Sequence, residues 1–290
     1  MKAIVTGSEG FIGKSLVEKL ESSGYEVIGY DIKNGDDVTQ LQNIPEVDEI
    51  YHLAATNGTR LFYEQPSEVL KNNTLITFAF DKYMHCYPNT RFIFASTCEI
   101  FNGAIDEFNW EVPTSENVPA VFNKLDNPRW SYSLPKALAE NYYINKYRNV
   151  SIIRYFNIFG ERQVDHFISE FIERAIRKKE YKIYGNDTRA FCYVKDAVAM
   201  TAQIGKSGQG TYNVGRQKEE NIETIAHQIL NELGLNEGLL EIFTGKIGSA
   251  KRRCPSMEKY ETEFGGFEYT DFSLALKETI KWNLKEMGNL

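Results

Sequence analysis

Residues 1–13 read MKAIVTGSEGFIG, and this stretch decides the fold. The β-branched, apolar run before the first glycine predicts a buried strand, and the amphipathic segment Phe11–Ser22 predicts a helix. Between them, Gly7 permits a sharp turn, Gly10 lets backbone approach a phosphate, and Gly13 lets the helix pack closely on the strand. The stretch therefore predicts a strand–turn–helix unit that binds a dinucleotide at the helix N-terminus.

The start of this helix and the end of the next strand supply further expected cofactor contacts. Phe11 and Ile12 open the helix, whose free N–H groups and partial positive charge favour a phosphate. Asp31 ends the second predicted strand, where a carboxylate can accept hydrogen bonds from the adenosine ribose hydroxyls. A 2′-phosphate there would meet both Asp31 and Glu9, so the sequence favours NAD over NADP.

The composition is that of a globular protein. Of the 290 residues, 42% are hydrophobic and 25% are charged, which allows one large core or two modest ones. The net charge of -7 lacks the positive field that nucleic acid or anionic lipid requires, so we expect neither a nucleic-acid nor a membrane partner. Four cysteines without paired spacing predict no metal site and no disulfide framework, and a reducing cytoplasm is the expected location.

The first half of the chain alternates short apolar runs with amphipathic stretches. The predicted strands are Lys2–Thr6, Glu26–Tyr30, Glu49–Leu53, Arg91–Ala95 and Ser151–Tyr155, and the predicted helices are Phe11–Ser22, Pro66–Cys86 and Trp130–Arg148. This alternation predicts an α/β fold with a doubly wound parallel sheet of the Rossmann type, which binds its ligand beyond the carboxyl ends of the strands.

After Tyr155 the alternation loosens. A helix is predicted over Asp165–Lys178, a strand pair near Lys182 and Phe191, and further helices over Asn221–Leu233 and Phe272–Trp282. We expect a smaller C-terminal domain interleaved with the last strands of the sheet. The predicted division is a cofactor-binding Rossmann domain at 1–155 plus about 191–216, and a substrate-binding domain at 156–190 and 217–290.

A tyrosine and a lysine four residues apart form the predicted catalytic centre. Tyr132 and Lys136 lie on one face of a helix. A phenol with a pKa near ~10 is a poor base at neutral pH, but an adjacent ammonium and a bound nicotinamide cation both stabilise its phenolate. Tyr132 could then take a hydroxyl proton while hydride leaves the same carbon for NAD. Thr97, at the end of the fourth strand, is the predicted hydrogen-bond partner of the reacting oxygen.

Together these motifs resemble the extended short-chain dehydrogenases/reductases, and among them the NAD-dependent nucleotide-sugar epimerase/dehydratase family. The resemblance implies an NAD cofactor, a nucleotide-diphosphate sugar as substrate, and a homodimer that pairs through the helices near 66–86 and 130–148. In the family, the counterparts of Asn157 and Arg189 contact the sugar nucleotide and its diphosphate. By the same resemblance, the cofactor contacts include Leu53, Ala54, Ala55 and Asn73.

Five other positions are less closely tied to the family pattern. Arg60, in the loop after the third strand, is a candidate for the sugar pocket. Arg253 is either a second phosphate contact or part of a solvated basic run. Asp37 and Val38 fall in a short connection that lacks room for the family's usual extra strand and helix, and we expect them to cap the adenine. Asn102 stands where the family has a glycine, so the turn after the fourth strand must differ.

The run Thr97-Cys98-Glu99 bears on the type of reaction. In 4,6-dehydratases the similar run is Thr-Asp-Glu, whose aspartate protonates the leaving hydroxyl and whose glutamate removes a proton beside the new ketone. Cys98 replaces that aspartate, whereas the Thr-Ser-Glu run of GDP-mannose dehydratases and UDP-glucuronate decarboxylases differs little from this one. Glu99 is therefore either a base for elimination or epimerisation or a carboxylate satisfied by local backbone. Cys98 is interpreted as a small buried side chain rather than a nucleophile.

The leading hypothesis is an NAD-dependent nucleotide-sugar epimerase that acts through a transient keto-sugar. Tyr132 accepts the hydroxyl proton, and Lys136 lowers the pKa of that phenol and holds the nicotinamide ribose. One alternative is a 4,6-dehydratase or decarboxylase that uses Glu99. A second is a non-catalytic dinucleotide-binding protein, which would keep the glycines and need neither Tyr132 nor Lys136.

Overall fold

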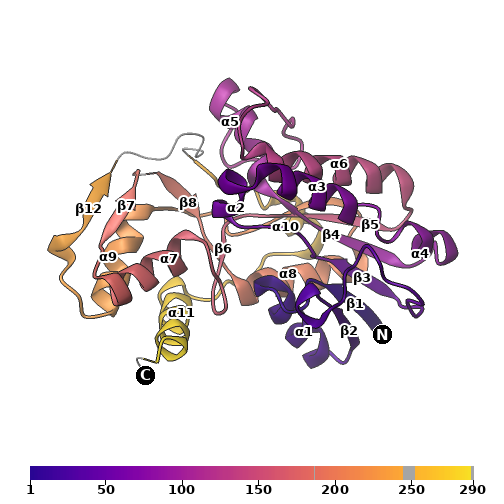
Figure 1. The fold of residues 1–290 in the computed structure, drawn as a ribbon, viewed down its shortest axis with the longest axis horizontal. Helices are drawn as coiled ribbons and strands as arrows, with labels where there is room; N and C mark the ends of the chain where they lie inside the picture. Colours follow the sequence, from indigo (N-terminus) through magenta and orange to yellow (C-terminus); the bar gives the residue numbers. More distant parts are fainter. Residues whose placement is uncertain (186, 244–251, 289–290) are drawn as a thin grey trace.

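A parallel six-stranded sheet forms the centre of the larger of two lobes (Figure 1). The computed structural model describes residues 1–185, 187–243 and 252–288. In the order β10-β5-β4-β3-β1-β2, the strands are β1 (Lys2–Thr6), β2 (Glu26–Tyr30), β3 (Glu49–His52), β4 (Arg91–Thr97), β5 (Val150–Tyr155) and β10 (Gly210–Val214). The strand order reverses beside β1, where doubly wound sheets bind their ligands. The predicted α/β fold is confirmed.

Helices cover both faces of this sheet. On one face α1 (Phe11–Ser22) packs against α8 (Val194–Ser207), and on the other α3 (Pro66–Ile76) packs against α6 (Trp130–Lys146) (Figure 1). The strands are correspondingly apolar on both sides, as every residue of β3 and β5 is buried. In α1 the buried positions recur at helical spacing, so the helix turns one apolar stripe toward the sheet.

The smaller lobe is built from helices and short strands that follow β5. Its helices are α7 (Phe167–Glu173), which continues into the wider turn η3 (Arg174–Lys178), α9 (Ile222–Glu232) and α11 (Phe272–Glu286). β7 (Lys182–Tyr184) pairs with β12 (Glu241–Phe243), and β8 (Thr188–Ala190) pairs with β11 (Glu219–Asn221). The predicted pairing of the strands near Lys182 and Phe191 is therefore wrong, because each finds its partner in a later segment.

Segments that join or flank the lobes complete the chain. β6 (Ile158–Phe159) pairs with β9 (Cys192–Tyr193), so the two crossings between the lobes lie side by side. The short helix α10 (Glu258–Phe264) packs near β10 of the sheet.

Among residues 1–185, 187–243 and 252–288, no helix combines the length and apolar character needed to cross a membrane.

The predicted helix over Pro66–Cys86 is broken in the structure. α3 ends at Ile76, and α4 begins at Asp81 and ends at Cys86. Between them, the amides of Thr77, Phe78 and Ala79 donate to carbonyls three residues back, which tightens the winding. This turn directs Phe80 into the core beneath the sheet, where it is 1% exposed. The burial of Phe80 therefore breaks a segment that the sequence pattern predicts as one continuous helix.

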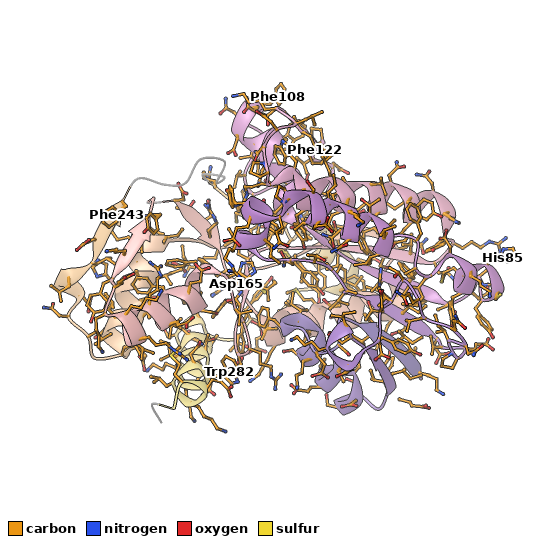
Figure 2. All side chains as sticks on the ribbon, in the orientation of Figure 1. His85, Phe108, Phe122, Asp165, Phe243 and Trp282 are labelled. Atoms are coloured by element: carbon orange, nitrogen blue, oxygen red, sulfur yellow. The ribbon has the colours of Figure 1, made fainter. Side chains whose placement is uncertain are left out.

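The segment after β4, which contains the asparagine at position 102, is helical throughout. Cys98–Phe101 forms a single 3-10 turn, and α5 (Asn102–Phe108) follows it at once. Thr97 caps the turn by accepting the Glu99 N–H at 3.1 Å. α5 projects from the larger lobe, with Phe108 near its tip (Figure 2). The turn places Glu99 beneath this projection, where its side chain is buried.

Candidate functional site

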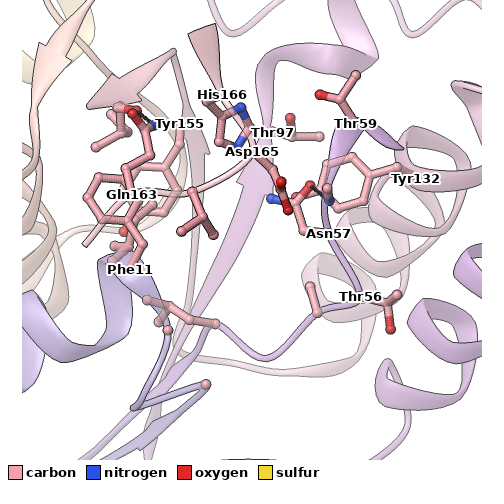
Figure 3. Close-up of a pocket in the computed structure, with 18 of the residues that line it drawn as sticks. Phe11, Thr56, Asn57, Thr59, Thr97, Tyr132, Tyr155, Gln163, Asp165 and His166 are labelled. Carbon is pink, nitrogen blue, oxygen red and sulfur yellow. Dashed lines mark hydrogen bonds between the residues drawn. The ribbon is translucent and has the colours of Figure 1, made fainter. Parts of the chain in front are cut away.

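A cavity of about 1900 Å³ runs along the carboxyl ends of the strands and between the lobes (Figure 3). It extends from the glycine turn after β1, past Leu53–Ala55, to Tyr132 and Lys136, and ends among arginines of the smaller lobe. The predicted site residues that line it are Gly7, Gly10, Phe11, Ile12, Gly13, Asp31, Asp37, Val38, Leu53, Ala54, Ala55, Arg60, Thr97, Cys98, Glu99, Tyr132, Lys136, Asn157, Arg189 and Arg253. The structure thus brings nearly all of them to one cavity.

Asn73 is the predicted cofactor residue that the cavity wall does not include. Its side-chain amide accepts the Thr56 N–H and donates to the Thr56 carbonyl, each at 2.9 Å. These two bonds fix the loop after β3 from behind. Asn73 therefore supports the cavity wall indirectly, because it fixes the backbone of Thr56, which lines the cavity.

The glycine turn has the geometry that its spacing predicts. Gly7 adopts a φ of 69°, a left-handed conformation that favours glycine. A Cβ at Gly13 would overlap the Gly7 carbonyl oxygen, so α1 can approach β1 only with glycine at this position. The first turn of α1 consequently lies against the end of β1, with its N-terminus at the cavity.

Asp31 lies beside this turn and organises its backbone. Its carboxylate accepts the Glu9 N–H at 3.0 Å and the Lys33 N–H at 2.9 Å. Lys33 in turn donates to the Glu9 carbonyl at 3.0 Å. Because a carboxylate can accept about four hydrogen bonds, Asp31 retains acceptor capacity toward the cavity.

Tyr132 and Lys136, the predicted catalytic pair, lie near the start of α6 with both side chains buried. Lys136 Nζ donates to the Ala95 carbonyl at 2.6 Å and lies 4.5 Å from the Phe94 ring centroid. Burial lowers the pKa of Lys136 to about 7, and it raises the pKa of Tyr132, to which Glu99 and Cys98 add. The Lys136 ammonium and the Tyr132 phenolate are each costly when they stand alone in a buried site. A Tyr132 phenolate therefore requires a positive charge beside it, and the sequence predicts two, the Lys136 ammonium and the nicotinamide cation.

Thr97 is the last residue of β4 and Cys98 is the next residue, and both line the cavity. The Thr97 oxygen accepts the Glu99 N–H, which leaves its hydroxyl proton free for a ligand. Burial raises the pKa of the Cys98 thiol to about 11, against the opposing influence of Arg253. Cys98 is therefore protonated at neutral pH.

Glu99 is engaged by charged and polar partners from three segments. Arg129 Nη2 lies 2.6 Å from Oε1, Arg253 Nη1 lies 2.9 Å from the same oxygen, and Asn102 Nδ2 donates to Oε2 at 2.7 Å. Burial would raise the pKa of Glu99, but these partners outweigh it and hold the pKa at about 2. A carboxylate of such low basicity accepts a proton poorly at neutral pH. Of the two alternatives for Glu99, this arrangement argues against the base, and the carboxylate is satisfied by side chains of distant segments as well as by nearby Asn102.

The two other buried arginines at this end come from the smaller lobe. Arg189, on β8, donates to the Thr188 carbonyl at 2.7 Å and lies 3.4 Å from Asp187. Burial, together with the charge of Arg253, lowers the pKa of Arg189 to about 10. Arg253 is 8% exposed, and its Nε and Nη2 have no partner among the described residues. Both guanidinium groups line the cavity, and Arg253 keeps two N–H donors that no described residue accepts.

Asn157 and Arg60 occupy different settings in the cavity. Asn157 has a φ of 40°, and it binds the Ala190 carbonyl through Nδ2 at 3.2 Å, which ties β5 to the strand that carries Arg189. The Arg60 side chain is 73% exposed and lies 3.8 Å from Glu64, one helical turn away. Arg60 thus lies at the rim rather than inside the pocket.

The family model described as NAD dependent epimerase/dehydratase family matches residues 3–215. The chain belongs to this family. It is 27% identical to a UDP-N-acetyl-alpha-D-glucosaminuronate decarboxylase of Bacillus cytotoxicus, over 99% of both chains. It is 30% identical to a putative UDP-glucose 4-epimerase of Methanocaldococcus jannaschii, over 96% of this chain and 97% of that protein. A Thermotoga maritima UDP-glucose 4-epimerase crystallised with UDP-glucose superposes with a TM-score of 0.81 at 24% identity, over 99% of this chain and 100% of that one.

As a member of the NAD dependent epimerase/dehydratase family, the chain is an NAD-dependent enzyme of the sugar-nucleotide class. The cavity fits that cofactor on its own geometry. Gly7 and Gly13 leave no room for a Cβ against the neighbouring backbone, so the turn packs closely enough to bring the N-terminus of α1 to the cavity. The acceptor capacity of Asp31 suits a ribose diol. The buried pair Tyr132 and Lys136 lies at the other end of the same cavity.

Residues that the sequence did not single out complete the site. Arg129 precedes Tyr132 by three residues, a spacing that places both near one face of the helix start, but its pairing with Glu99 carries no local signal. Phe62, in the short helix α2 (Thr59–Glu64), stacks on the Tyr132 ring. A second buried pair, Glu140 with Arg154, packs behind Lys136 and has an N–O distance of 2.7 Å.

Replacing Glu99 by glutamine tests the ion-pair cluster through stability. At pH 7, Glu99→Gln leaves two buried guanidinium groups without their carboxylate, and we expect the free energy of unfolding to fall by about 3–5 kcal/mol. The folded-state pKa lies below the ordinary 4.5, so the pairs stabilise fully above that pH, and the difference from wild type shrinks as pH falls toward about 2. Urea unfolding at a series of pH values measures this difference in the free energy of unfolding.

The control variant is Glu26→Gln, which breaks the exposed pair between Lys2 and Glu26. We expect it to cost less than about 1 kcal/mol, because solvent screens exposed pairs. Equal losses from the two variants would contradict a buried, ionised Glu99.

Proposed function

We propose that this enzyme is an NAD-dependent nucleotide-sugar epimerase that oxidises a sugar hydroxyl transiently and returns the hydride. The observation that carries the proposal is the protonation state of Cys98 and Glu99 at neutral pH, a protonated thiol and an ionised carboxylate. A dehydratase needs an acid and a base beside the sugar, but the Cys98 thiol has a pKa of about 11 and the Glu99 carboxylate one of about 2. Epimerisation through a ketone needs the Tyr132 proton carrier alone.

Three side chains of the larger lobe would act on the reacting hydroxyl. Thr97 donates its hydroxyl proton to the reacting oxygen and so orients it. Tyr132 accepts the hydroxyl proton and later returns it, while the Lys136 ammonium stabilises the phenolate and binds the nicotinamide ribose. The nicotinamide, when bound, supplies a hydride acceptor. The Ala95 carbonyl holds Lys136 in place, since it accepts from Nζ at 2.6 Å.

The diphosphate of the substrate would lie against Arg189 and Arg253. Both side chains are buried, and the pKa of Arg189 is lowered by burial and by the charge of Arg253. A bound dianion relieves this repulsion and takes up the free N–H groups of Arg253. In this way a protein with a net charge of -7 can hold an anionic substrate locally.

A decarboxylase of a sugar acid is the second candidate. Nε and Nη2 of Arg253 form an adjacent pair of donors, the geometry that a carboxylate accepts in bidentate fashion. Arg253 pairs with Glu99, and Glu99 lies close enough to Tyr132 to raise the pKa of the Tyr132 phenol. The two free donors of Arg253 are therefore held near Tyr132. The Bacillus cytotoxicus relative is named as a decarboxylase of a sugar acid, in agreement with this arrangement.

Product mass separates the two candidates. We expect the enzyme, with catalytic NAD, to convert a UDP-, GDP-, dTDP- or CDP-sugar into a product of unchanged mass, whereas a decarboxylase product lacks carbon dioxide. Tyr132→Phe should lower kcat by about 10²–10⁴-fold, because the proton carrier is lost. Tyr87→Phe, which removes a phenol outside the cavity, should leave kcat unchanged. Turnover only with stoichiometric NADH, or an undiminished Tyr132→Phe variant, would contradict the proposal.

We also propose that the enzyme forms a homodimer through α3 and α6. These neighbouring helices, together with the turn that follows α3, expose large apolar side chains, which a partner would cover: Leu70, Leu75, Phe78, Leu138 and Ile144. Exposed apolar patches of this kind mark protein interfaces. In a symmetric dimer each helix pair would pack on its own copy.

An aspartate on this surface tests the dimer. Leu138→Asp buries a charge at the interface, so we expect the variant to sediment as a monomer while wild type sediments as a dimer. Leu274→Asp, at an equally exposed leucine of α11, should leave the dimer intact. A monomeric wild type, or a dimeric Leu138→Asp variant, would refute this interface.

A further inference from the structure

The short helix α2 packs directly against the proposed proton carrier. The rings of Phe62 and Tyr132 stack at a centroid distance of 5.0 Å and an angle of 19°. Both side chains are buried, at 4% and 9% exposure. With Val69 of α3 they form a small apolar cluster of their own, separate from the main cores, and Ala55 and Leu61 pack against it. One face of the Tyr132 ring thus packs against α2.

Packing, and not polar contacts, determines where this phenol lies. In the described part of the chain, no hydrogen bond is made by the Tyr132 hydroxyl, whereas Lys136 is fixed by the Ala95 carbonyl. An aromatic ring that lacks a polar anchor keeps its χ2 orientation only through its neighbours. The stack with Phe62 supplies such a neighbour on the side of the cavity.

The next residue of α2 contacts the charged part of the same site. The Arg129 guanidinium hydrogen-bonds Tyr63, and it pairs with Glu99 through Nη2. Phe62 and Tyr63 therefore hold two groups, Tyr132 and Arg129, that belong to the start of α6. Figure 1 places α2 at the edge of the larger lobe that faces the smaller one, and both residues line the cavity.

We propose that α2 is a positioning element, in which Phe62 holds the Tyr132 ring at the reacting hydroxyl. Proton transfer requires the phenol oxygen within hydrogen-bond reach of the substrate, and errors of about 1 Å cost up to about 10²-fold in rate. Phe62 touches no reacting atom and acts through Tyr132. This inference rests on the proposed function only in giving Tyr132 the role of proton carrier.

Substitution of Phe62 tests the role in catalysis. We expect Phe62→Leu to lower kcat by about 10- to 100-fold while KM changes by less than about threefold, because orientation is lost and binding is kept. Phe62→Tyr retains a ring for the stack and should restore most of kcat. Phe80→Leu is the matched control: it removes a buried phenyl ring from another cluster and should lower thermal stability without this loss of kcat.

A measurement on the tyrosine itself does not depend on any substrate. In protein labelled with 3-fluorotyrosine, the Tyr132 fluorine resonance is assigned by its absence in Tyr132→Phe. A stacked Phe62 ring shifts this resonance, and we expect Phe62→Leu to abolish that shift and to broaden the line, while Phe80→Leu leaves it in place.

These two measurements separate the inference from the proposed function. An altered fluorine resonance in an enzyme that converts no nucleotide sugar would support the packing role and defeat the proposed function. Unchanged resonance, or an equal fall in kcat for Phe62→Leu and Phe80→Leu, would overturn the positioning role. An increase in KM with constant kcat would do the same, because it would assign Phe62 to substrate binding.

Discussion

The carboxylate of Glu99, held between Arg129 and Arg253, is the constraint on which the site depends. It joins the turn after β4, the start of α6, and the segment of the smaller lobe that carries Arg253. A buried charge that loses its partner costs several kcal/mol, so these three segments are held together in one arrangement. That arrangement sets where α6 begins, and with it the positions of Tyr132 and Lys136.

The same cluster determines what the site can do chemically. With its pKa held at about 2, Glu99 serves as a permanent counter-charge rather than a base. In the proposed mechanism the proton transfer falls to Tyr132, whose phenolate is costly in a buried site until positive charge lies beside it. The two Arg253 donors that no described residue accepts favour an anionic substrate in an otherwise acidic protein.

Local sequence patterns predicted the fold, and nearly all of the site residues predicted from sequence line the cavity, because both depend on short-range chemistry. The glycine turn, the alternation of strands and helices, and the Tyr132 and Lys136 spacing can all be recognised within a few residues. Contacts between distant segments could not be predicted in this way. Arg129 and Arg253 reach Glu99 from 30 and 154 residues away, β7 pairs with β12 rather than with its neighbour in sequence, and α2 meets Tyr132 only in the folded chain.

The central claim is that hydride leaves the sugar and returns to the same molecule. Its most direct test is a nucleotide sugar deuterated at the ring carbons, converted by the enzyme in ordinary water with catalytic NAD, and examined by NMR. The account predicts that the oxidised carbon keeps its deuterium in the product, because one bound cofactor takes the hydride and gives it back. Hydrogen from water at that carbon, or deuterium in free NADH, would contradict it.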